Sequence, residues 1–174
     1  MSQIVLSPQV LRAVTRYVAE CARDVLEVFE RVHPDDPRPR AAIAAAQVFA
    51  DGGERGKTLR DTAWAALKAA QNSSTAAASQ AARAAMVAAG AAYLHPLANA
   101  TQVKHILGSP AHAARALECN ASDDPEVGAA HITRAAERAS LEVIAVLKRY
   151  LPAPSGGGRV GALMRTLDAM LRER

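Results

Sequence analysis

Aromatic residues are scarce in this chain of 174 residues, where one tryptophan, three tyrosines and two phenylalanines make up 3% of the total. Proteins that hold single-stranded nucleic acid stack its bases on aromatic side chains, so this class of function is disfavoured. Lysine and arginine exceed aspartate and glutamate by only 21 to 17, and no run of five like charges occurs. Without the clustered cations of a nucleic-acid footprint, the sequence does not indicate nucleic acid as a partner.

Cysteine and long apolar segments are scarce as well. Cys21 and Cys119 are the two cysteines and both fall within helical patterns, so we expect buried, reduced thiols. The longest apolar run, residues 84–94, is too short to cross a membrane. The first ten residues lack the apolar centre of a secretion signal. We therefore expect a soluble, cytoplasmic protein without a membrane partner.

Alanine is abundant instead, with 41 residues in the chain. Alanine is the best helix former, and its small side chain lets helices approach closely. A capping residue precedes proline at four places, where its oxygen can accept from the first N–H groups of a helix: Ser7, Asp36, Ser109 and Asp124. Thr75 and Ser140 are further candidate caps. We predict an all-α, single-domain helical bundle of about eight helices over residues 1–174, with no sheet.

Apolar spacing at steps of three and four residues predicts where the helices lie. The alanine-rich helix over 75–94 should be central. Residues 152–158 contain two prolines and three glycines, so we expect a flexible linker there, before a C-terminal helix over 160–172 that folds back on the bundle. The remaining helices are expected at about 8–31, 37–50, 57–71, 96–107, 110–120, 125–139 and 141–151.

The sequence Gly56-Lys57-Thr58 resembles the end of a phosphate-binding loop. That motif needs a glycine five positions before Gly56, and Asp51 occupies this position. The preceding segment also has helical composition rather than that of a buried strand. We therefore expect a helix that stops at Gly52 and Gly53, then a loop, then a new helix from about Lys57.

Signatures of metal binding and catalysis are also missing. No two histidines have the four-residue spacing of a helical metal site, and no Cys-x-x-Cys pair occurs. His105 and His112 are seven residues apart, but Gly108-Ser109-Pro110 should break the helix between them. The acid pairs Asp35–Asp36 and Asp123–Asp124 stand at expected helix caps, and no nucleophile motif occurs. We predict no cofactor, no metal ion and no enzymatic activity.

The stretch HPDDPRPR, residues 33–40, combines three prolines with charges of both signs. One interpretation is a rigid turn with local pairing between aspartate and arginine. The other is a preformed patch that docks a partner protein, because a rigid surface loses little entropy on binding. The candidate partner-binding residues are His33, Asp35, Asp36, Arg38 and Arg40.

Longer stretches resemble a family of bacterial proteins, the type-five-like immunity proteins of polymorphic toxin systems. The resemblance is carried by HPDDPRPRAAIAAAQVFADGG, AYLHPLANATQVKHILGSPAHAARAL, DDPEVGAAHITRAAERA and GGGRVGALMRTLDAML. It implies a small cytoplasmic protein that binds and neutralises a toxin domain through a large complementary surface. Some members carry an exonuclease-subunit label, which no motif here supports. Inhibitors of nucleases tend to be acidic, so a pI near 9.4 disfavours a nuclease partner.

Two other functions remain open. The main alternative is a helical domain with a small-molecule pocket or a hydrolytic site built around His95, His105 or Trp64, and a buried, histidine-lined cavity would favour it. The third is a self-associating structural protein. Alanine-rich helices can pack across a homodimer interface as readily as within one chain.

Overall fold

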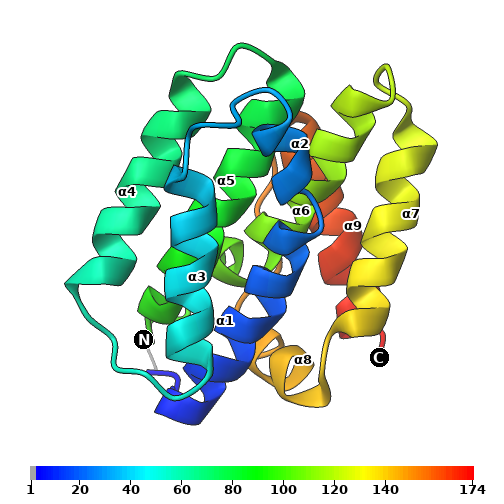
Figure 1. Cartoon of the computed structure of the whole chain (residues 1–174). Coiled ribbons are helices and arrows are strands. Elements are labelled where there is room, and N and C mark those ends of the chain that lie inside the picture. The colour runs from blue at the N-terminus through cyan, green and yellow to red at the C-terminus, as the bar shows by residue number, and fades with distance from the viewer. Residues whose placement is uncertain (1–2) are drawn as a thin grey trace.

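Four helices of the computed structural model, which describes residues 3–174, begin at caps predicted from the sequence (Figure 1). Each capping oxygen accepts a hydrogen bond from an N–H group in the first turn, which would otherwise lack a partner. The donors are Val10 for Ser7, Ala78 for Thr75, Glu126 for Asp124 and Val143 for Ser140, at 2.9–3.2 Å.

The all-α prediction is confirmed for the described residues, which contain nine α-helices, two short 3-10 turns and no strand. The only extended pairing among them is one isolated bridge between Gln3 and Leu97. The α-helices are α1 (Pro8–Arg23), α2 (Leu26–Glu30), α3 (Arg38–Ala50), α4 (Lys57–Gln71), α5 (Ala76–Gly90), α6 (Lys104–Asn120), α7 (Pro125–Arg138), α8 (Leu141–Leu147) and α9 (Gly158–Arg172). The 3-10 turns are η1 (Ala91–Tyr93) and η2 (Ala100–Val103).

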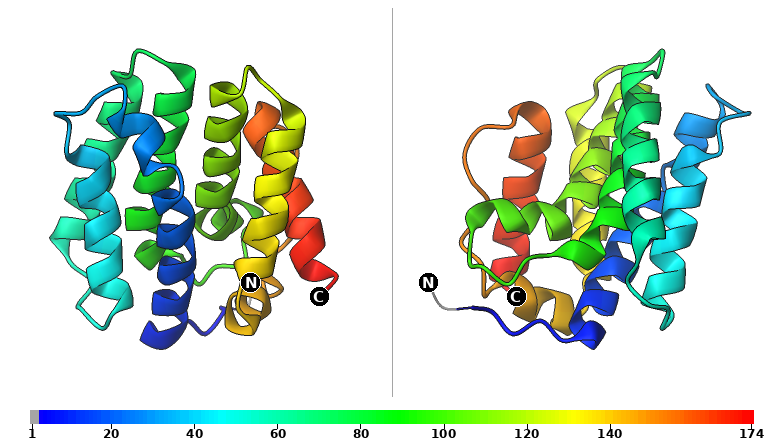
Figure 2. Two further views of the ribbon diagram at one scale, coloured as in Figure 1. Left: turned by 45° about the vertical axis from the view of Figure 1, so that its right-hand side comes forward. Right: turned by 90° about the vertical axis from the view of Figure 1, so that its left-hand side faces the viewer.

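Helix α5 is central, as its alanine content predicted. It packs against α1, α2, α3, α4 and α6, and eight of its alanines are buried. Because alanine projects only a methyl group, five neighbours can approach the same helix closely. Figure 2 shows α3 and α4 on one side of α5, with α6, α7 and α9 on the other. One hydrophobic core joins all these layers.

The predicted helix over 8–31 is wrong in one respect, because it divides into α1 and α2 at Asp24 and Val25. Val25 leaves the helical region, with φ −119° and ψ 5°, while remaining fully buried. The apolar stripe therefore continues from Val25 to the buried Phe29 across the break. The spacing of apolar residues indicates only which face of a helix is buried. It therefore could not predict the break between α1 and α2.

The predicted break at Gly108-Ser109-Pro110 is also wrong, because α6 runs unbroken from Lys104 to Asn120 with Pro110 inside it. All three residues are buried. The Ser109 hydroxyl donates a hydrogen bond of 2.8 Å to the carbonyl oxygen of Val18 in α1. Packing of α6 against α1 and α5 thus outweighs the cost of a proline within a helix. Residues 96–99, expected to start a helix, lie outside any helix.

The segment between α8 and α9 turns the chain back on the bundle, where α9 packs against α6 and α7 as expected. Gly156, Gly157 and Gly158 all have positive φ, between 58° and 84°, a region that glycine enters without steric cost. Arg165 donates to the carbonyl oxygens of Pro154 and Gly156 at 3.1 and 2.7 Å. The flexibility expected for residues 152–158 stays a prediction.

An ion pair between Glu118 of α6 and Arg159 of α9 links these two helices. The Glu118 side chain is only 1% exposed, and its carboxylate accepts hydrogen bonds from Arg159 of α9 at 2.5–3.1 Å and from Arg115 at 3.0 Å. Burial alone would raise the pKa of Glu118, but hydrogen bonds from Arg159 and Arg115 outweigh it and hold this pKa below its usual range. Glu118 is therefore a buried charge that depends on two arginines.

Candidate functional site

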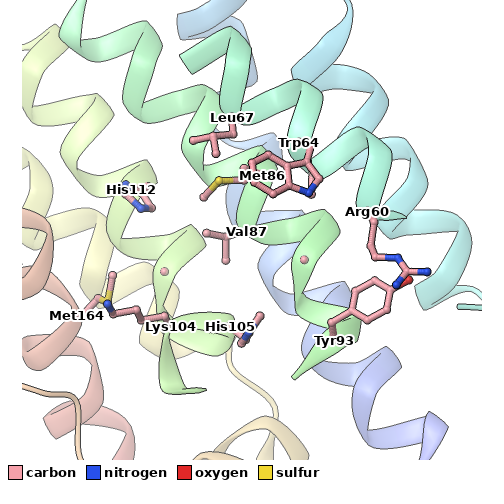
Figure 3. Close-up of a pocket in the computed structure, with 13 residues that line it drawn as sticks. Arg60, Trp64, Leu67, Met86, Val87, Tyr93, Lys104, His105, His112 and Met164 are labelled. Atoms are coloured by element: carbon pink, nitrogen blue, oxygen red, sulfur yellow. The ribbon is translucent and has the colours of Figure 1, made fainter. Parts of the chain in front are cut away.

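A groove of about 610 Å³ opens between α4, α5 and α6, with Met164 of α9 at its edge (Figure 3). We call it the Trp64 groove. Most of the side chains that line it are apolar, which is typical of a binding surface rather than of solvated protein surface. The lining residues are Arg60, Ala63, Trp64, Leu67, Met86, Val87, Gly90, Tyr93, Lys104, His105, Gly108, His112 and Met164.

Trp64 is the most conspicuous residue of the groove because its side chain is 65% exposed. Helix α4 buries Leu59, Ala66 and Ala70, which leaves Trp64 outside the core. A single exposed apolar residue is ordinary, but this one adjoins further apolar groups that also line the groove, including Leu67 and Met86. A contiguous apolar surface of this kind marks a site of interaction.

Two histidines of α6 line the groove, although the sequence predicted that a helix break would separate them. The continuous helix places His105 and His112 two turns apart on one face. His112 Nδ1 lies within hydrogen-bond distance of the Gln80 side-chain oxygen, at 2.6 Å. Burial lowers the pKa of His112 to about 4, and it also lowers the pKa of His105. Both rings are therefore neutral at pH 7.

Arg60 and Lys104 line the groove, and no carboxylate of residues 3–174 does. The guanidinium groups of Arg60 and Arg55 lie over the ring of Tyr93, at 5.3 and 5.4 Å from its centre. Lys104 lies across the groove from Arg60 (Figure 3). A second hollow, which shares Lys104, His112 and Met164 with the groove, is also lined by Arg83. Within residues 3–174 none of these four cations forms an ion pair.

The predicted partner-binding residues lie between α2 and the start of α3, and most of their charges are paired within the chain. Asp36 accepts two hydrogen bonds from the Arg38 guanidinium at 2.9 and 2.6 Å, which lower the pKa of this carboxyl. Arg40 donates two bonds of 2.7 Å to Glu30. His33 Nε2 accepts from the Ser74 N–H at 3.3 Å and lies 3.0 Å from the Ser73 hydroxyl. Asp35 is exposed and has no ion-pair partner among the described residues.

The alternative pocket residues divide between two places. His105 and Trp64 both line the groove, whereas His95 is not among its lining residues. His95 Nδ1 accepts from the Leu97 N–H at 3.1 Å, and its carbonyl oxygen accepts from the Tyr150 hydroxyl at 2.7 Å. Sequence reasoning missed Arg60, Met86 and the other lining residues. An outward tryptophan on α4 was the one signal that could have found them.

The segment that resembles a phosphate-binding loop is a helix end, as predicted. The N–H groups of Gly52 and Gly53 donate to the carbonyl oxygens of Phe49 and Val48 at the end of α3. Helix α4 then begins at Lys57, whose ammonium group pairs with Asp61 at 2.8 Å. The two glycine N–H groups and this lysine therefore already have partners within the chain.

Three further observations concern residues 3–174. Cys21 and Cys119 are free thiols, the first buried and the second half-buried. No group of three histidine, cysteine or acidic side chains is placed so that it could hold a metal ion. No helix in this part of the chain has both the length and the apolar character needed to cross a membrane.

Two histidines, the buried His131 and the half-buried His112, should make the protein sensitive to mild acid. Burial lowers the pKa of both His112 and His131 to about 4, while each would titrate near 6.5 in the unfolded chain. Because the unfolded chain takes up these protons first, stability is fully present above pH 6.5 and falls as the pH drops toward 4. We expect a loss of about 2 kcal/mol per histidine between pH 7 and pH 5.

Urea unfolding at pH 7 and pH 5 measures this loss. His131 is buried and its Nε2 has no hydrogen-bond partner in the structure, so its contribution should be separable. In the variant His131→Gln, which cannot titrate at this position, the loss should shrink by about 2 kcal/mol. Equal unfolding free energies at the two pH values in the wild-type protein would contradict the expectation.

The family model described as "Imm-5 like putative immunity protein" matches residues 5–142. No curated protein matches, and no solved structure matches. The matched region includes every lining residue of the Trp64 groove except Met164. Since the match covers most of the chain, this protein belongs to the Imm-5 like immunity protein family.

Proposed function

We propose that this protein neutralises a bacterial toxin domain by binding it directly, with the Trp64 groove at the centre of the contact. Family membership supports the general role, and the exposed indole of Trp64 within an apolar groove is the observation that carries the choice of surface. The protein would act by covering a functional surface of the toxin, without a catalytic step of its own.

The composition of the groove favours a protein partner. Tryptophan, tyrosine, methionine and arginine are the residues enriched at protein interfaces, and Trp64, Tyr93, Met86 and Arg60 supply one of each. Methionine adapts its shape to a partner at low cost. A complete interface buries about 800 Å² on each partner, so the contact would extend beyond the groove over neighbouring parts of α4 and α5.

Co-expression tests the proposed function. A toxin domain encoded beside this gene is placed under an inducible promoter in a laboratory bacterium, with or without this protein. The proposal predicts that cells survive induction only when the protein is present, and that the two proteins co-purify in a 1:1 complex. Cell death at the same rate in both strains, with both proteins expressed and folded, would overturn it.

The loop of residues 33–40 remains a proposed second contact, because Asp35 is exposed and unpaired among the described residues. If it takes part, Asp35→Ala should weaken toxin binding several-fold, as for one exposed charge pair. A variant that also changed Asp36, Arg38 and Arg40 would break the ion pairs that hold the loop in its conformation. The single variant tests the contact of Asp35 with the toxin without this disturbance. Glu173→Ala, another exposed carboxylate, is the control, and equal affinities of both variants would remove the loop from the interface.

A further inference from the structure

The geometry points to the kind of segment that the Trp64 groove binds. It is an amphipathic helix with carboxylates along both edges of its apolar face. This inference rests on the proposed function and specifies the chemistry of the partner. It joins two independent observations, the apolar floor of the groove and the unpaired cations around it.

The floor of the groove fits the apolar stripe of a helix. Leu67 from α4 and Met86 and Val87 from α5 line it together, and Met164 from α9 extends it at the edge of the groove (Figure 3). These side chains come from three helices, so they form a surface between helices. Helices that dock in such grooves insert apolar side chains at steps of three and four residues.

The rim of the groove selects negative charge. Arg60 and Lys104 lie on opposite sides, and neither has an acidic partner among the described residues. Arg138 and Arg159, by contrast, each bridge two helices through an ion pair, with Asp24 and Glu118 respectively. His105 and His112 add no compensating negative charge. A bound helix would therefore place carboxylates beside Arg60 and Lys104.

This charge pattern also restricts the toxin. A nuclease presents a basic surface to nucleic acid, and such a surface would face the cations of the groove and be repelled. The inferred partner therefore offers an acidic surface to this protein. Either the toxin is not a nuclease, or the groove binds a part of the toxin that lies outside the nucleic-acid site of the toxin.

Two synthetic 18-residue helical peptides test the inference without the toxin. Both carry leucine and phenylalanine at the same positions, with glutamate flanking the apolar face in one and lysine in the other. Trp64 is the only tryptophan of the protein, so its fluorescence reports on the groove directly. We expect the acidic peptide to bind at least about tenfold more tightly at low salt, and this preference to shrink at about 0.5 M salt.

Charge reversal supplies the decisive variant. R60E/K104E should reverse the preference between the two peptides, whereas R134E/K148E, with the same change in net charge at exposed positions elsewhere, should keep it. Equal binding of the two peptides, no binding of either, or a preference that survives R60E/K104E would overturn the inference. Survival of toxin-producing cells is a separate measurement. Protection of those cells without a peptide preference would contradict this inference alone. A peptide preference without protection of the cells would contradict the proposed function alone.

Discussion

Replacement of Trp64 by alanine is expected to weaken toxin binding about a hundredfold and to leave the fold intact. Tryptophan at the centre of an interface commonly contributes 2 kcal/mol or more to binding. The side chain is 65% exposed in the free protein, so its removal should change the free energy of unfolding by less than about 0.5 kcal/mol. Titration calorimetry with the purified toxin domain measures the first effect, and urea unfolding measures the second.

The matched control is Leu141→Ala, which removes another exposed apolar side chain, 78% exposed at the start of α8 and outside the groove. It should bind the toxin as the wild-type protein does. Equal affinities of Trp64→Ala and the wild-type protein would contradict the placement of the contact. A loss of stability in Trp64→Ala alone would show that the indole serves the fold.

Glu118→Ala is expected to lower the free energy of unfolding by about 3 kcal/mol, the largest effect on stability that we predict for a substitution. Removal of one member of a buried ion pair leaves its partner without compensation. Arg159 would lose its one carboxylate partner among the described residues, and Arg115 would keep only Asp123, at 2.9 Å. Helix α9 would also lose its main polar contact with α6. The partial exposure of the two arginines keeps the estimate at the lower end of the range for buried pairs.

Urea unfolding of three variants checks this second prediction. Glu118→Gln keeps the size of the side chain and some of its hydrogen bonds but removes the charge, so its loss should be smaller than that of Glu118→Ala. Glu27→Ala breaks an exposed pair with Arg31 and should cost less than about 0.5 kcal/mol. If Glu118→Ala lowered the free energy of unfolding no more than Glu27→Ala does, the contact of Glu118 with α9 would not stabilise the fold as we predict.

Much of the fold could be predicted from the sequence because its signals are local. The caps at Ser7 and Asp124 start helices where expected, and glycines end α3 as predicted. Ser109-Pro110 has the same local form as Ser7-Pro8, yet it lies inside α6. The two cases differ in their tertiary contacts. Ser109 is buried against α1, where its hydroxyl donates a hydrogen bond to the carbonyl oxygen of Val18. A local rule could not separate these two cases.

The site was harder to predict than the fold. One interpretation of residues 33–40, local pairing between aspartate and arginine, agrees with the pair that Asp36 forms with Arg38. The pairing of Arg40 with Glu30 could not be predicted, because it depends on the turn that the chain makes there. The groove depends on α4, α5 and α6 lying side by side and on the continuity of α6 through Pro110. Once α6 is continuous, His105 and His112 reach the same surface as Trp64.

Hydrogen–deuterium exchange of this protein, alone and with its toxin domain bound, shows whether the toxin covers the Trp64 groove. We predict slower exchange in the complex for residues 57–71 of α4 and for the end of α5, on the side of the Trp64 groove. Residues 141–147 of α8 should exchange as in the free protein. Protection confined to residues 33–40, or protection that leaves α4 unchanged, would contradict the claim that the toxin binds in the groove.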